Sequence, residues 1–148
     1  MWGMLTTAAF LVAAACGAER PVDGQEARSR VGHETILDET HSGLDKPLSQ
    51  VVHDEGRWRE LWDQIHRGVS PRPPLPPVDF SRHMLIAVAT GTRRSGGFGI
   101  AVRSVAVREN ELEVEVLETC PASGAMVTLA LTQPVAVVRV ERLPWTPI

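Results

Sequence analysis

Several residue types that often mark a function are scarce in this chain. Its 148 residues include no tyrosine, two cysteines and a single lysine, Lys46, and the other fourteen cationic residues are arginine. Two cysteines are too few to frame a disulfide-rich miniprotein. The formal net charge is -3 and the arginines are scattered, whereas a nucleic-acid surface needs clustered positive charge. We therefore expect no nucleic-acid partner.

Motifs of catalysis and metal binding are also lacking. The sequence has no H-E-x-x-H, C-x-x-C, G-x-S-x-G or G-x-x-x-x-G-K-[ST] motif. None of the histidines lies at metal-binding spacing from another; they are His33, His41, His53, His66 and His83. Ser95 precedes two glycines, which favours a tight turn over an activated nucleophile. We predict a protein that is not an enzyme and has no metal site and no cofactor.

The first fifteen residues, MWGMLTTAAFLVAAA, carry no charge. They are too short to cross a bilayer as a helix, which takes about 20 residues, but they suit the apolar region of a secretory signal. Three alanines then precede Cys16, an arrangement that resembles a bacterial lipobox, in which the cysteine is acylated and the chain is cut before it. Residues 1–16 are therefore predicted to be a signal segment with Cys16 as the lipidation site.

Two features depart from that pattern. No basic residue begins the segment, and Ala13 stands where a lipobox usually has leucine. Plain secretion with cleavage near Ala15 or Ala18 stays open, and so does an uncleaved apolar terminus. The predicted location is thus the cell envelope, either as a membrane-anchored lipoprotein or as a periplasmic or secreted protein. If Cys16 is acylated, Cys120 has no intramolecular partner, and it is predicted to be a buried, inert thiol.

Composition divides the rest of the chain into a tether and one domain. Residues 17–33 have almost no large apolar side chains and are predicted to be a flexible tether. Residues 34–148 are predicted to form a single domain. It begins with a short strand over residues 35–40, followed by a turn-rich stretch from His41 to Lys46.

Residues 53–66 give the clearest helical pattern. The apolar side chains of Trp58, Leu61, Trp62 and Ile65 recur at helical spacing and form one stripe. After this helix, residues 70–77 read SPRPPLPP, and five prolines in eight residues exclude a helix or a central strand. This segment is either a stiff connector or a proline-rich ligand for a recognition module.

The remainder follows the pattern of strands. Residues 83–90 are almost continuously apolar, as in a strand covered on both faces. Apolar residues alternate from Phe98 and change parity at Arg103–Ser104, which predicts a bulge or bend. They alternate again over 112–116, which gives a hairpin. Residues 128–132 are ambiguous between a strand and a helical turn, and residues 135–141 are the last strand. The predicted fold is α+β, a small antiparallel sheet of four or five strands with one amphipathic helix packed on it.

An ordered set of short motifs resembles a known family. The set is Val78-Asp79-Phe80-Ser81, Met84-Leu85-Ile86-Ala87-Val88, Gly91-Thr92-Arg93, Ser95-Gly96-Gly97-Phe98, Ile100, Glu118-Thr119-Cys120-Pro121, Val127-Thr128, Ala130-Leu131-Thr132 and Pro134. It resembles the C-terminal domain of the PrcB family of protease-complex subunits, over roughly residues 78–142.

The resemblance implies a role without catalytic residues. The family takes its name from an accessory subunit of a bacterial cell-surface protease complex, itself a lipoprotein. We therefore expect an exported binding or assembly module, an accessory subunit that docks another envelope protein such as a protease. It would meet the membrane through the lipid anchor at Cys16.

The loop after residues 83–90 is the predicted binding surface. Two guanidinium groups beside a glycine turn are suited to bind a carboxylate or an acidic loop, and solvated charge is the alternative. The candidate binding residues are Arg93, Arg94, Ser95, Gly96, Gly97 and Phe98.

A protease inhibitor is the alternative function. Small β domains can plug a protease cleft with glycine-rich turns, here residues 91–97. Residues 142–145, Arg142-Leu143-Pro144-Trp145, offer a second loop with a tryptophan anchor. This loop is similar to the R-P-W loop of chagasin-like cysteine-protease inhibitors, although Leu143 interrupts the motif.

Overall fold

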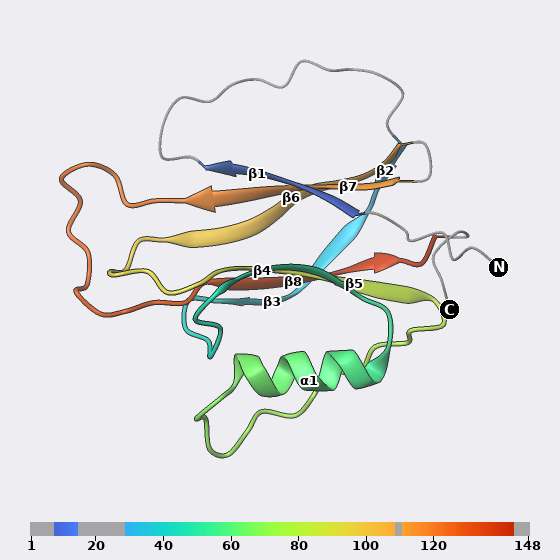
Figure 1. Ribbon diagram of the computed structural model, residues 1–148, viewed down its shortest axis with the longest axis horizontal. Coiled ribbons are helices and arrows are strands. Elements are labelled where there is room, and N and C mark those ends of the chain that lie inside the picture. The colour runs from blue at the N-terminus through green and yellow to red at the C-terminus, as the bar shows by residue number, and fades with distance from the viewer. Residues whose placement is uncertain (1–7, 15–28, 109–110, 144–148) are drawn as a thin grey trace.

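The computed structural model describes residues 8–14, 29–108 and 111–143 (Figure 1). Cys16 and most of the predicted tether lie outside these residues. The described elements are β1 (Ala8–Ala14), β2 (Ser29–Val31), β3 (His33–Glu39), β4 (Pro47–Val52), α1 (Glu55–Ile65), β5 (His83–Thr90), β6 (Gly99–Arg108), β7 (Glu111–Thr119) and β8 (Val135–Glu141).

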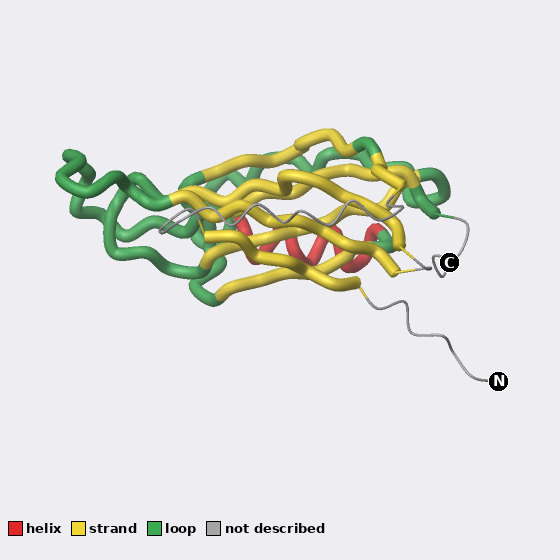
Figure 2. Tube along the Cα trace, turned by 90° about the horizontal axis from the view of Figure 1, so that it is seen from above, coloured by secondary structure: helices red, strands yellow, loops and turns green. Residues whose placement is uncertain are grey.

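The strands form two sheets, and the helix adds a third layer. One sheet has the order β1-β7-β6-β2 and the other has the order β3-β8-β5-β4. Helix α1 covers the face of the second sheet that points away from the first (Figures 1 and 2). The α+β content agrees with the prediction, but a single sheet of four or five strands is wrong. Alternation shows which face of a strand is buried, not which strands share a sheet.

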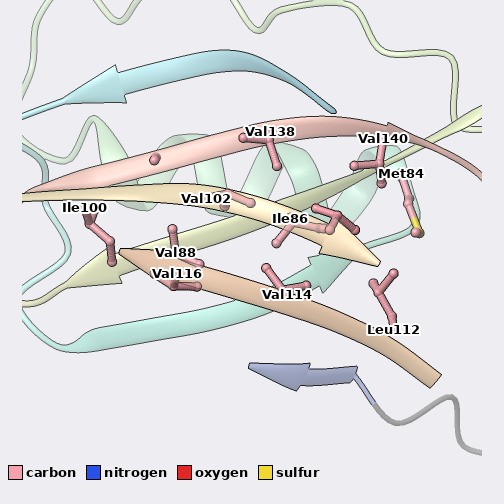
Figure 3. Close-up of a cluster of buried hydrophobic side chains, with 12 residues drawn as sticks. Met84, Ile86, Val88, Ile100, Val102, Leu112, Val114, Val116, Val138 and Val140 are labelled. Carbon is pink, nitrogen blue, oxygen red and sulfur yellow. The ribbon is translucent and has the colours of Figure 1, made fainter. Parts of the chain in front are cut away.

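The strand β5 supplies side chains to both cores. Met84, Ile86 and Val88 point into the core between the two sheets (Figure 3). The residues of opposite parity, Leu85, Ala87 and Ala89, pack against the helix. β8 follows the same rule, with Val138 on the sheet side and Val137 on the helix side. The continuous apolar run over residues 83–90 is thus explained, and its prediction as a strand covered on both faces is confirmed.

The predicted hairpin and bulge are both present. β6 and β7 pair antiparallel, and their register shifts between Val102, opposite Val116, and Ser104, opposite Glu115. Because of this extra residue, Val105 returns to the same core as Val102 despite its odd spacing. The bulge is what lets one long strand keep its apolar face inward along its whole length.

Three strands lie where the sequence did not predict them, and the first is β1, within the predicted signal segment. β4 forms over a proline-led stretch, PLSQVV, whose pattern contains only a short apolar end. β2 lies inside the predicted tether, so the folded domain begins before residue 34. Each is a strand because it finds a partner distant in sequence: β1 pairs with β7, β2 pairs with β6, and β4 pairs with β5.

Helix α1 confirms the strongest helical prediction. The side chain of Asp54 accepts a hydrogen bond from the backbone N–H of Arg57 at 2.8 Å and caps its first turn. All four residues of the predicted apolar stripe are buried against the sheet. In the described part of the chain, no helix is long and apolar enough to cross a membrane.

The proline-rich segment connects α1 to β5 and closes over the two helix tryptophans. The indole N–H of Trp58 donates to the carbonyl of Pro76 at 3.1 Å, and that of Trp62 donates to the carbonyl of Pro73 at 2.9 Å. A buried indole N–H needs such an acceptor. The prolines therefore act here as a connector whose carbonyls complete the helix layer.

Candidate functional site

The predicted binding residues lie in the loop between β5 and β6, at one end of the sandwich. The segment between β7 and β8 lies beside this loop (Figure 1). The N–H of Arg93 donates to the carbonyl of Thr132 at 2.7 Å, and the N–H of Thr132 donates back at 3.0 Å. The N–H of Gly96 donates to the carbonyl of Thr128 at 2.9 Å. We call residues 91–98 and 121–132 together the loop surface.

Arg93 is committed within the domain. Its Nη2 lies 3.1 Å from the Oε2 of Glu118, and its guanidinium carbon lies 5.5 Å from the centroid of the Phe98 ring. The Nε of Arg93 is buried and has no hydrogen-bond partner. This guanidinium is already paired with a carboxylate and stacked near an aromatic ring. It therefore stabilises the loop and is not available to bind a ligand.

Arg94 is the guanidinium that remains accessible. Its side chain is exposed, and it forms no ion pair with any residue that the structure describes. The predicted pair of ligand-binding arginines is therefore split into one structural and one free residue. Only Arg94 fits the predicted role of binding a partner's carboxylate.

Gly96 and Gly97 lie where the two segments of the loop surface approach each other closely. Gly97 has φ of +87°, and a Cβ added there would lie 2.8 Å from the Cβ of Pro121. A Cβ at Gly96 would lie 2.5 Å from the Oγ1 of Thr128. Both positions thus need glycine because the two loops touch there.

Ser95 has a local structural role. Its hydroxyl donates to the carbonyl of Gly96 at 3.0 Å, and its own carbonyl accepts from the Oγ1 of Thr132 at 2.8 Å. A nucleophilic serine would instead have an activating base at its hydroxyl. These contacts agree with the turn predicted from the sequence.

The most exposed apolar side chains of the loop surface were missed by the sequence reasoning. Relative to full exposure, Met126 is at 102%, Leu129 at 93% and Leu131 at 60%. Leu129 and Leu131 lie in the segment left ambiguous between strand and helical turn, and Met126 lies just before it. That segment forms neither, apart from the isolated β-bridge between Thr132 and Arg93. Residues 119–135 contain no charged residue, and this absence was the available signal. Large apolar side chains on a hydrogen-bonded loop mark a contact surface.

The histidines do not assemble into a metal site. Among the residues that the structure describes, no group of three His, Cys, Asp or Glu side chains is placed to hold a metal ion. His66 is buried against the Trp62 ring at 4.1 Å between centroids, and its Nδ1 lies 3.1 Å from the Trp62 carbonyl. Burial lowers the pKa of His53, with a further contribution from nearby Arg142, and its buried Nδ1 has no hydrogen-bond partner.

Cys120 differs from its prediction as a buried, inert thiol. It is half-buried and disulfide-bonded. The sequence contains one other cysteine, Cys16, which lies outside the described residues, as does the lipidation predicted there. The prediction assumed that Cys120 is a free thiol whenever Cys16 is acylated.

The two loops of the inhibitor hypothesis lie at opposite ends of β5. Residues 91–97 follow the end of this strand, whereas the N–H of Arg142 donates at 2.8 Å to the carbonyl of Arg82, just before its first residue. Eight residues of strand separate them by roughly 25 Å. Residues 144 and 145 lie outside the described part of the chain. Arg142 and Leu143, the described part of the second loop, therefore lie at the other end of β5 from residues 91–97.

The fold and the loop surface together define a small β-sandwich domain, covered by one helix, that offers apolar side chains and one arginine for contact. Residues 84–141 match the family model described as PrcB C-terminal. The predicted resemblance is thereby confirmed over this part of the chain, which runs from β5 to the end of β8 and includes both loops of the surface. No curated protein and no solved structure matched the chain.

Proposed function

We propose that this protein is an exported, non-catalytic binding module that docks another envelope protein through the loop surface. The observation that carries the proposal is the near-complete exposure of Met126 and Leu129. Burying a leucine or methionine side chain contributes about 1.5–3 kcal/mol. A loop that leaves two of them in water is best explained by a partner that covers them.

The loop surface is already ordered for contact. Backbone hydrogen bonds at Arg93 and Gly96 tie its two segments together, and the Arg93–Glu118 ion pair holds its base. A preordered loop loses less conformational entropy on binding, so more of the apolar gain becomes affinity. The same contacts explain why the glycine turn and the apolar segment occur together.

The charge of the surface specifies the chemistry of the partner. Arg93 is neutralised by Glu118, which leaves Arg94 as the charged side chain of the loop surface that makes no ion pair with the described residues. A complementary partner has an apolar pocket bordered by a carboxylate. The PrcB family supports a protease-complex subunit as the wider role, and we propose a protease or its neighbour in the envelope as the partner.

Export is supported by the state of Cys120. Disulfides form and persist in oxidising compartments outside the cytoplasm and are rare within it. A disulfide-bonded Cys120 therefore agrees with the signal segment predicted at residues 1–16.

The same disulfide bears on the lipid anchor predicted at Cys16. A thiol cannot be acylated and disulfide-bonded at once, and the sequence offers Cys120 no other cysteine. This supports the periplasmic or secreted form over the anchored one. Mass spectrometry of the N-terminal peptide from native envelope, without reduction, tests the choice. We expect a peptide linked to Cys120, and a diacylated Cys16 would instead establish the lipoprotein.

Site-specific photocrosslinking tests the binding role. A photoreactive residue in place of Leu129 should capture one envelope protein in the native host. An excess of the wild-type protein, added as a competitor, should reduce that capture. An excess of the Leu129→Asp variant should not reduce it. A photoreactive residue at Val69 is the matched control. Val69 is also an exposed apolar residue, at 47%, but it follows helix α1 and is not part of the loop surface. Equal products from positions 69 and 129 would contradict the proposed surface.

A further inference from the structure

The outer edge of β7 is covered by the N-terminal strand of the same chain. β1 pairs with β7 in parallel along its whole length, from Ala8 opposite Leu112 to Ala14 opposite Glu118. The other edge of β7 pairs with β6. Figure 1 shows β1 as the outermost strand of this sheet. Among the residues that the structure describes, β1 is the strand that pairs with the backbone groups along this edge of β7.

Side chains of β1 also complete the core. Ala8 and Phe10 are partly buried and pack against the cluster between the sheets. Phe10 lies opposite Val114, which is fully buried within that cluster. In contrast, Leu11 is 49% exposed on the alternate parity. The edge thus accepts an extended segment with inward apolar residues at positions 8 and 10, whereas Val12, of the same parity, is 54% exposed.

The strand that covers this edge belongs to the segment predicted to be a signal. Cleavage near Ala15, which keeps Cys16 in the mature chain, removes all of residues 8–14. The mature domain then presents the edge of β7 without β1. It also loses the Phe10 ring beside Val114, so that an exposed ladder and an apolar gap open at the same place.

We propose that, in the mature protein, an extended apolar segment of the partner replaces β1 and pairs in parallel with β7. This inference rests on the export proposed above. The partner segment has a large apolar residue at the position of Phe10 and a small one at the position of Ala8. At the outward position of Leu11 any residue type is tolerated. Strand addition of this kind obtains affinity from backbone hydrogen bonds and specificity from alternate side chains.

The probe for this edge is a synthetic peptide with the sequence of residues 8–14, flanked by lysines for solubility and labelled with a fluorophore. Mature protein is purified from the native envelope, and its first residue is determined by mass spectrometry. We expect the peptide to bind saturably in fluorescence anisotropy. Hydrogen exchange of the β7 amides should slow in the complex, while exchange in α1 stays unchanged.

Two altered peptides separate specific pairing from general stickiness. The Phe10→Asp peptide should bind at least tenfold more weakly, because it places a charge against the buried Val114 region. The Leu11→Asp peptide carries the same charge at the outward position and should keep its affinity within about threefold. Equal weakening of both peptides, or binding of both like the unaltered one, would overturn the strand-addition site.

Other results would also reject the inference. Retention of residues 8–14 in the envelope form would mean that β1 keeps the edge covered. A mature chain that leaves the unaltered peptide unbound would show that the edge does not accept a strand. Neither result touches the crosslinking at Leu129, so failure of this edge is distinguishable from failure of the loop surface. Loss of the Leu129 crosslink with retained peptide binding would instead reject the loop surface and leave the strand-addition site supported.

Discussion

Arg93 shows how a residue with no evident partner in the sequence can acquire one in the fold. Its guanidinium contacts Glu118 on β7 and the face of the Phe98 ring, just before β6. We expect Arg93→Ala to lower the free energy of unfolding by about 1–2 kcal/mol, the sum of a partly shielded ion pair and a cation–π contact. Urea denaturation followed by circular dichroism measures the change.

Arg94 provides the matched control for that prediction. It is exposed and makes no ion pair with the described residues, so Arg94→Ala should change stability by less than about 0.5 kcal/mol. Arg94→Ala should instead weaken partner capture through the loop surface. If both variants cost the same stability, the structural role assigned to Arg93 is wrong.

His53 predicts a pH dependence of stability. Burial foremost, and then the charge of Arg142, lower its pKa in the folded state, while Asp54 acts in the opposite direction. The folded state therefore binds fewer protons than the unfolded state. Stability is full above the unfolded pKa of about 6.5 and falls as the pH drops through the lowered folded value.

The variant His53→Gln isolates this contribution. Its free energy of unfolding should decrease less than that of the wild type between about pH 7.5 and about pH 5.5, because the group whose protonation favours unfolding is gone. Urea midpoints at the two pH values give the comparison. Identical decreases in both proteins would exclude His53 as a source of acid sensitivity in this range.

At the scale of elements, two glycines of positive φ separate backbone strain from contact. Gly97 has φ of +87° and lies against Pro121, whereas Gly124 has φ of +80° and would place an added Cβ in open space. Gly124→Ala should cost about 1 kcal/mol for the left-handed conformation alone. Gly97→Ala should cost at least about 1 kcal/mol more, because the two loops must also separate.

Thermal or urea unfolding of the two variants measures that difference directly. Gly97→Ala should in addition reduce the Leu129 crosslink, since Gly97 and Pro121 join the two halves of the loop surface. Equal stability loss in both variants would mean that the approach of the loops does not constrain position 97.

Local pattern was sufficient for elements whose burial is visible in the sequence. The stripe of α1 and the parity change at Arg103–Ser104 each reflect one buried face, and both predictions are confirmed. β4 was missed because its partner β5 is more than thirty residues away, and its own sequence, PLSQVV, does not alternate between apolar and polar residues. The hydrophobic pattern of a segment shows that one of its faces is buried, but not which element it packs against or pairs with.

The candidate site was predictable only in part, for the same reason. The glycine loop was recognised from its residues, but the division of labour between Arg93 and Arg94 depends on Glu118, twenty-four or more positions away. The exposure of Met126 and Leu129 was not predictable, since an apolar residue in a sequence normally indicates a buried one. Their position between two prolines and far from any charge was the one local sign.

At the scale of the whole molecule, the three layers should unfold together. β5 and β8 face the sheet–sheet core on one side and the helix core on the other, so neither core can separate from these strands independently. Strands shared in this way make the two cores one cooperative unit. A lesion in one core should therefore be felt in the other.

The variant Ile86→Val tests this coupling from the side remote from the helix. Ile86 is fully buried between the sheets, and loss of one methylene there should cost about 0.5–1.5 kcal/mol. Trp58 and Trp62 report on the helix layer when Trp2 and Trp145 are replaced by phenylalanine, while far-ultraviolet circular dichroism reports on the sheets. Both signals should shift to the same lower urea midpoint. A fluorescence transition that stays in place while the circular dichroism transition moves would show that the helix layer is held on its own. The shared strands would then be connectors rather than a common core.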